Sequence, residues 1–219
     1  MQAIKSLVKD VEAILDGHTI ILEVPYHSQE DPDARHYRND CGPDCLEMIM
    51  QYFGRTKKAV DVLSGESHLS VQDNGLTMEQ IAALLKKEAF PCQVRSSLTI
   101  GAIEAELSKG RPVLCLINYT YIPRENVPDH YGHFVLVVGI TDTHVLLNDP
   151  DYWGIRRNEG DHKQILRADF LKALEYAPIA YTGIFLDDSV SRPNKSPAPA
   201  PVTGDARTNP KRIAKEPVG

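Results

Sequence analysis

Two buried strands joined by a tight turn are predicted by the stretch GHFVLVVGITDTHVLLNDP (132–150). The first strand runs from His133 to Ile140 and the second from His144 to Asn148, both rich in β-branched and other apolar residues. Only the short segment TDT separates them, so the strands are expected to pair antiparallel, with the start of one beside the end of the other. His133 and Asp149 are therefore predicted to be neighbours at one edge of a sheet.

The rest of the chain is predicted to form helices, most of them before this hairpin, and several further strands. Thr77 and Gln80 fit the capping box that begins a helix, and Gly110 is typical of the residue that ends one. Helices are predicted at 42–53, after Thr77, at 99–107 and at 168–176, and further strands at 19–24, 112–118 and 179–186. Helices first and strands later indicate an α+β fold, with N-terminal helices packed on an antiparallel β-sheet.

Length and composition indicate one globular domain with additional segments at its ends. The chain has 219 residues, of which 42% are hydrophobic and 25% charged. We expect an amphipathic N-terminal helix within residues 1–20, a folded domain over 21–187, and a disordered, Pro-rich basic tail over 188–219. The net charge of -6 argues against nucleic acid or an anionic membrane as a partner. The longest apolar run, Phe134–Ile140, is too short to span a membrane.

The four cysteines are expected to be reduced thiols. Charged residues interrupt the N-terminus where a signal peptide would be apolar, so a cytoplasmic location is predicted. Cys41 differs from the others because it opens a predicted helix, where unpaired N–H groups and the helix dipole stabilise a thiolate. A thiol in that position facing a histidine oriented by a carboxylate is the arrangement of an activated nucleophile. Cys41, His133 and Asp149 are therefore candidate catalytic residues.

At this point the sequence resembles the C39-like cysteine peptidases, which have a papain-like fold. The matching pieces are VPYHSQ (24–29), NDCGPDCLEMI (39–49), GHFVLVVGI (132–140) and LLNDP (146–150), together with the segment at 96–118. The resemblance implies that Cys41 is the nucleophile, His133 its base and Asp149 the partner that orients the base. It also implies that the Gln29 amide helps to bind the oxyanion, that the substrate is a peptide or protein, and that no cofactor or metal is needed.

Other interpretations of the same residues remain open. A cysteine near a helix start is often only a small buried side chain, and the fold could serve as a catalytically silent module that binds peptides or proteins. Cys41 and Cys45 have a Cys-x₃-Cys spacing that, with His36 and the histidines at 130 and 133, permits a zinc site, although no second tight pair of ligands is present. Trp153 either covers the site or packs at its rim.

Overall fold

The computed structural model describes residues 19–31, 39–66, 69, 75–123 and 131–191. The predicted N-terminal helix lies outside these residues, as does the predicted tail apart from 188–191. The strands are β1 (Ile20–Ile21), β2 (Cys92–Arg95), β3 (Val113–Asn118), β4 (Gly132–Ile140), β5 (His144–Asn148), β6 (Lys163–Leu166) and β7 (Gly183–Leu186). Within the described residues they form one antiparallel sheet in the order β2-β7-β3-β4-β5-β6, with β1 added along β4.

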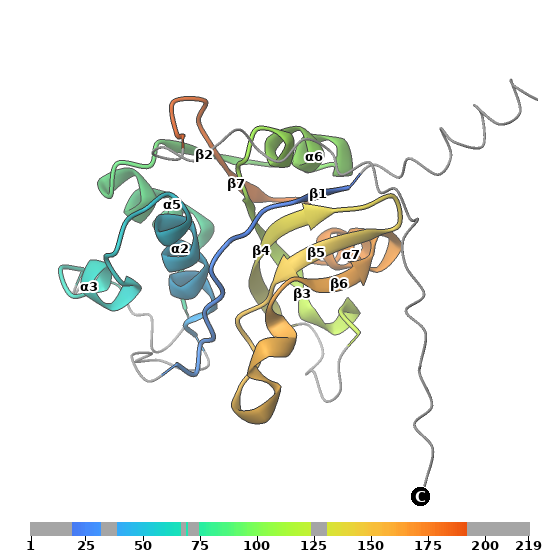
Figure 1. Cartoon of the computed structure of the whole chain (residues 1–219), viewed down its shortest axis with the longest axis horizontal. Helices are drawn as coiled ribbons and strands as arrows, with labels where there is room; N and C mark the ends of the chain where they lie inside the picture. Colours follow the sequence, from blue (N-terminus) through green and yellow to red (C-terminus); the bar gives the residue numbers. More distant parts are fainter. Residues whose placement is uncertain (1–18, 32–38, 67–68, 70–74, 124–130, 192–219) are drawn as a thin grey trace, which may run out of the picture.

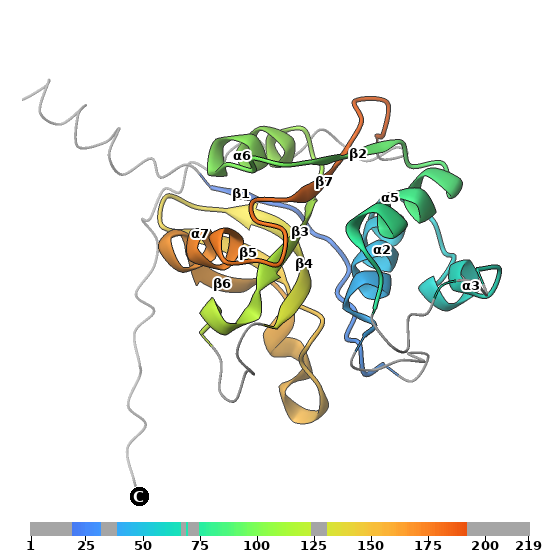
Figure 2. The same cartoon turned by 180° about the vertical axis from the view of Figure 1, so that it is seen from behind.

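Helices cover the sheet on more than one side. They are α2 (Cys41–Tyr52), α3 (Ala59–Leu63), α5 (Met78–Lys87), α6 (Ile100–Ser108) and α7 (Arg167–Glu175), with 3₁₀ turns η1 (Tyr119–Tyr121) and η2 (Gly154–Gly160). α2 packs on β4 and against α5, and these helices lie with α3 beside the sheet (Figure 1). α7 packs on β3, and Figure 2 shows it in front of the sheet, on the face turned away in Figure 1. The expected α+β architecture is confirmed.

Local sequence signals explain where several helices begin and end. The Thr77 hydroxyl accepts a hydrogen bond from the Gln80 N–H at 3.2 Å, and the Gln80 side chain accepts one from the Thr77 N–H at 2.8 Å. This reciprocal pair is the predicted capping box. Thr99 caps α6 in a similar way, and Gly110 follows that helix with φ of +74°, which only glycine adopts without strain.

Two predicted strands are shorter than expected. The strand predicted at 19–24 is reduced to β1, which pairs only with the end of β4 before the chain turns away. The strand predicted at 179–186 begins only at Gly183, because Tyr181 has a left-handed φ of +52° that interrupts extended backbone. Strand β6 was not predicted, since its four residues KQIL include only two apolar ones and the strand lies at the sheet edge, where only Ile165 is buried.

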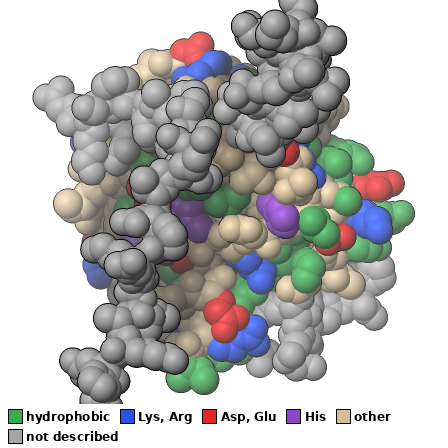
Figure 3. Space-filling model, turned by 45° about the vertical axis from the view of Figure 1, so that its right-hand side comes forward, with side chains coloured by type: hydrophobic (Ala, Val, Ile, Leu, Met, Phe, Trp, Pro, Cys, Tyr) green, Lys and Arg blue, Asp and Glu red, His purple; other side chains and the backbone are tan. Residues whose placement is uncertain are grey.

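The surface of the described residues is mixed in character. No helix in the described part of the chain is long and apolar enough to cross a membrane. On the face drawn in Figure 3, acidic and basic side chains lie interspersed among apolar ones, with no broad area of one sign. The apolar side chains of the core gather instead between the sheet and the helices that cover it.

Candidate active site

Cys41 is the first residue of α2, and its side chain is buried with 8% of its surface exposed. Pro43 occupies the first turn of the helix, where its missing N–H costs no hydrogen bond. Gly42 packs so closely that an added Cβ would lie 2.9 Å from Ile81 of α5 and 3.4 Å from Phe134 of β4. The absence of a side chain at Gly42 therefore allows the start of α2, with its thiol, to pack tightly between α5 and β4.

His133 is the second residue of β4, and its ring is fully buried. Its Nε2 lies 2.8 Å from Oδ1 of Asp149, the residue that directly follows β5. The antiparallel pairing of β4 with β5 places the two residues at one edge of the sheet, as the hairpin predicted. The Asp149 N–H also donates to the Gly160 carbonyl at 2.9 Å, which ties the carboxylate-bearing loop to the end of η2.

The Asp149 carboxylate is held by three donors. Oδ1 accepts from Nε2 of His133 and from the Asp151 N–H at 3.1 Å, and Oδ2 accepts from the Tyr119 hydroxyl at 2.8 Å. Burial by itself raises the pKa of this carboxyl, but the charge of His133 and these hydrogen bonds lower it below its ordinary value. Asp149 is therefore built to remain ionised inside the protein.

The other side of the His133 ring meets the thiol. Burial lowers the pKa of the imidazole, but the charge of Asp149, its hydrogen bond and the interaction with Cys41 together raise it to about 10. Nε2 is hydrogen-bonded to Asp149, so Nδ1 is the ring nitrogen left to interact with Cys41. Nδ1 is buried and accepts or donates no hydrogen bond among the described residues. The structure thus brings Cys41, His133 and Asp149 together in that order.

Gln29 lies against the loop that follows Asp149. Its N–H donates to the Pro150 carbonyl at 2.9 Å, and its Nε2 donates to Oδ1 of Asp151 at 3.1 Å. Oε1 of the same side chain is buried and has no hydrogen-bond partner among the described residues. The described residues show no hydrogen bond between Gln29 and Cys41, so Gln29 joins the site through the Asp149–Asp151 loop.

Gly160, the last residue of η2, lies against the backbone of Asp149 where no side chain fits. A Cβ at this position would overlap both the Asp149 carbonyl oxygen and the Tyr26 hydroxyl. The Tyr26 hydroxyl itself donates to the Asp149 carbonyl at 2.9 Å, so the backbone of Asp149 is fixed from two directions. Any side chain larger than hydrogen at Gly160 would displace the residue that orients His133.

Sequence reasoning missed two side chains at the site. Tyr119 contacts both Asp149 and His133, and only its place after a predicted strand could have suggested this. Asp44 lies one turn into α2, almost fully buried, with Oδ2 unpartnered among the described residues. Burial raises the pKa of Asp44 well above its ordinary value, and the neighbouring Asp40, Cys41 and other acids add to that effect.

The remaining thiols differ from Cys41 in their surroundings. All four cysteines are free and buried, and Cys41, with 8% of its surface exposed, is the least buried of them. Burial raises the pKa of Cys92 to about 11 and raises the pKa values of Cys45 and Cys115 further. Cys45 is fully buried in α2 and packs in the core. Of the other residues considered for zinc, His36 and His130 lie outside the described residues.

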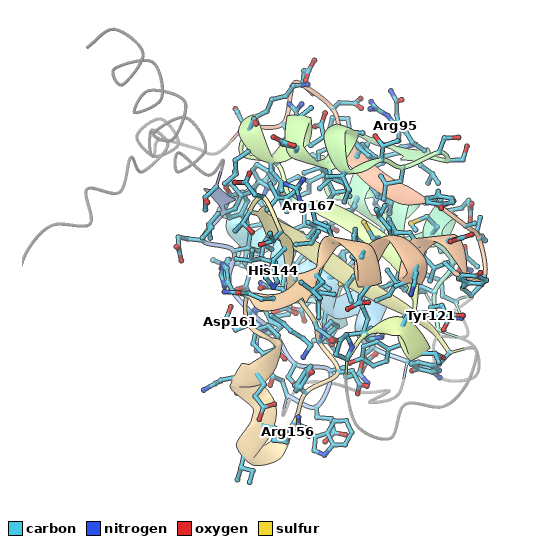
Figure 4. All side chains as sticks on the ribbon, turned by 90° about the vertical axis from the view of Figure 1, so that its right-hand side faces the viewer. Arg95, Tyr121, His144, Arg156, Asp161 and Arg167 are labelled. Carbon is cyan, nitrogen blue, oxygen red and sulfur yellow. The ribbon has the colours of Figure 1, made fainter. Side chains whose placement is uncertain are left out.

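The segment after Asp149 separates into a buried anchor and a projecting turn. Tyr152 is buried, and its carbonyl accepts from the Ser28 hydroxyl at 2.5 Å, whereas 47% of Trp153 is exposed. η2 follows and projects from the body, with Arg156 near its tip and Arg95 at the opposite end of the molecule (Figure 4). Tyr152 is therefore the buried residue of this pair, and Trp153 is the exposed one.

Residues 21–183 match the family model described as the Peptidase C39 like family. This chain belongs to the Peptidase C39-like family. A search of curated proteins found no match. Among solved structures, a Bacillus anthracis protein named as a C39-like peptidase is 17% identical, with a TM-score of 0.58, covering 79% of this chain and 99% of that chain. The peptidase domain of Streptococcus ComA, a bifunctional ABC transporter of a quorum-sensing pathway, is 16% identical with a TM-score of 0.52, covering 75% and 98%.

These similarities support the fold and the family rather than individual roles. At such identities, the solved structures show that this C39-like chain shares their papain-like arrangement of helices and sheet. The resemblance noted from the sequence motifs is thereby confirmed at the level of the family. Any chemical role of Cys41, His133 and Asp149 has to rest on the geometry of these residues and not on the similarities.

Proposed function

We propose that this C39-like protein is a cysteine peptidase that hydrolyses a peptide bond through a Cys41–His133–Asp149 triad. The observation that carries the proposal is the fully buried His133–Asp149 pair at 2.8 Å, whose imidazole also interacts with the Cys41 thiol at the start of α2. A cationic imidazole and a helix N-terminus both favour the thiolate, the form in which cysteine is a nucleophile.

The proposed reaction has two halves. The Cys41 thiolate attacks the carbonyl carbon of the scissile bond, the C–N bond breaks, and His133 gives its proton to the departing amine. Water, deprotonated by His133, then attacks the resulting thioester and releases the carboxylate product while the thiol is restored. Asp149 keeps the imidazole oriented and balances its positive charge through both halves.

The oxyanion is proposed to be bound by two N–H donors, the Cys41 backbone amide and Nε2 of Gln29. One hydrogen on Nε2 is used by Asp151, which leaves the other able to point toward the thiol. As the first residue of α2, Cys41 has a backbone N–H with no partner within the helix. Losing one such donor typically lowers kcat about 10²- to 10³-fold.

The test compares Cys41→Ala with Cys45→Ala, because both residues are buried on the same helix and only the first belongs to the proposed triad. Each protein is incubated with a peptide library made from a digested proteome, and new termini are counted by mass spectrometry. We expect wild type and Cys45→Ala to cleave the same sites and Cys41→Ala to cleave none, with a transient acyl adduct on Cys41.

Two outcomes would contradict the proposal. Equal cleavage by Cys41→Ala would exclude Cys41 as the nucleophile. Retention of library peptides without cleavage by any of the three proteins would favour the catalytically silent binding module instead.

A further inference from the structure

One buried side chain, Tyr119, contacts two members of the proposed triad at once. It opens the η1 turn directly after β3, and only 1% of its surface is exposed. Its hydroxyl donates to Oδ2 of Asp149 at 2.8 Å. Its ring lies against the His133 imidazole, with centroids 4.2 Å apart and planes tilted by 32°. No other described aromatic residue combines a hydrogen bond to Asp149 with a ring contact to His133 at this distance.

The backbone around Tyr119 is fixed in a way that sets this geometry. The Tyr119 N–H donates to the Tyr131 carbonyl at 2.8 Å, which continues the β3–β4 pairing one step beyond the sheet. Asn118 ends β3, and its side chain accepts from the Thr120 N–H at 3.1 Å and donates to the Tyr176 carbonyl at 3.0 Å. The turn that carries Tyr119 is thus tied to β4 and to the end of α7.

The two carboxylate oxygens of Asp149 have separate partners. Oδ1 serves His133 and the Asp151 N–H, and Oδ2 serves the Tyr119 hydroxyl. A carboxylate held at both oxygens resists rotation about its terminal bond, so Oδ1 stays aligned with Nε2 of His133. A hydrogen bond donated to an ionised acceptor also favours the ionised form. The aromatic ring meanwhile limits the tilt of the imidazole on its other flank.

We infer that Tyr119 is a positioning residue of the triad, acting through its hydroxyl on Asp149 and through its ring on His133. The inference rests on the proposed function and deepens it, because it names what keeps the His133–Asp149 pair aligned and charged when Cys41 reacts. Tyr119 is not itself expected to touch the substrate.

The test uses Tyr119→Phe, which removes only the hydroxyl, with Tyr121→Phe as its matched control. Tyr121 lies on the same turn but stacks on Tyr176, with ring centroids 5.0 Å apart. The rate of Cys41 alkylation by iodoacetamide is measured by mass spectrometry, for each cysteine separately, from about pH 4 to pH 9. This readout needs no substrate, and a purely structural role for the hydroxyl would not move its pH profile.

The Cys41 thiolate is paired with the His133 cation, which the ionised Asp149 supports, so the acid limb of the Cys41 profile reports on how well Asp149 holds that cation. A hydrogen bond to a charged group typically changes such an equilibrium at least tenfold, so Tyr119→Phe should move the acid limb upward by about one pH unit. Tyr121→Phe should leave the profile of wild type unchanged. Thermal melting checks that both variants are folded.

The outcomes separate this inference from the function on which it rests. If Cys41 of wild type labels no faster than the other three cysteines at low pH, the proposed function fails and the positioning role with it. If wild-type Cys41 is selectively labelled but Tyr119→Phe has the same profile, or Tyr121→Phe shifts as much, the inference about Tyr119 alone is wrong.

Discussion

Replacing Asp149 by Asn removes the charge beside His133 while keeping the shape of the side chain. Burial lowers the pKa of His133, yet the Asp149 charge and hydrogen bond, with Cys41, raise it from an ordinary 6.5 to about 10. Each pKa unit corresponds to about 1.4 kcal/mol, so folding stabilises the protonated form of the His133 ring by roughly 5 kcal/mol relative to a histidine of ordinary pKa. Most of this free energy should disappear in Asp149→Asn.

The sign of the pH dependence follows from the raised pKa. The stabilisation is fully present below about pH 6.5 and is lost as the pH rises toward about 10, so the free energy of unfolding of wild type falls across that range. In Asp149→Asn the buried ring keeps only its interaction with Cys41, so its pKa is raised much less and this slope should become shallower. At about pH 6 the variant should be less stable by about 3–5 kcal/mol, the usual cost of breaking a buried ion pair.

Urea unfolding at intervals from about pH 6 to pH 9 measures both quantities. The matched control is Asp161→Asn, because Asp161 also pairs with a histidine, His162, at 2.6 Å but is about half exposed. Such surface pairs contribute little, so this variant should stay within about 1 kcal/mol of wild type and keep its pH slope. Parallel pH slopes for wild type and Asp149→Asn would refute the assignment of the charged pair.

Two further changes test the packing and the capping described above. Gly160→Ala should destabilise the fold by about 1–3 kcal/mol in thermal melts, because the new Cβ overlaps the Asp149 carbonyl, whereas Gly101→Ala, with open space around it on α6, should be neutral or slightly stabilising. A loss no larger than that of Gly101→Ala would contradict the close packing. Thr77→Ala should cost about 1 kcal/mol in urea unfolding by removing the acceptor for the Gln80 N–H, and an unchanged midpoint would show that the cap is dispensable.

Local signals in the sequence were sufficient for the parts of the structure that are themselves local. The capping box at Thr77 needs only two residues three positions apart, and the hairpin that joins His133 to Asp149 needs only two apolar segments around a short turn. Both were predicted because the partners are close in sequence. Cys41, whose helix lies far upstream of that hairpin, was predicted from its place at a helix start, and the resemblance to C39-like peptidases implied the same residue.

Contacts that depend on distant pairing were beyond the same reasoning. Tyr119 reaches Asp149 only because the end of β3 meets the start of β4, and nothing in its neighbouring residues marks it as different from Tyr121. Strand β6 is short and lies at a sheet edge, where only Ile165 is buried and hydrophobic periodicity is weak. The left-handed Tyr181 likewise shortens β7 through a conformation that sequence pattern does not reveal.

The place of β7 in the sheet has a consequence for the order in which the protein can assemble. β7 is the strand nearest the C-terminus, yet it lies between β2 and β3, and no other strand of the described sheet bridges those two. The chain is synthesised from its N-terminus. The backbone edges of β2 and β3 that pair with β7 therefore stay unpaired until residues 183–186 have left the ribosome. The sheet is thus completed by an interior strand inserted last, and the newborn chain cannot join its two parts before nearly the whole domain has been synthesised.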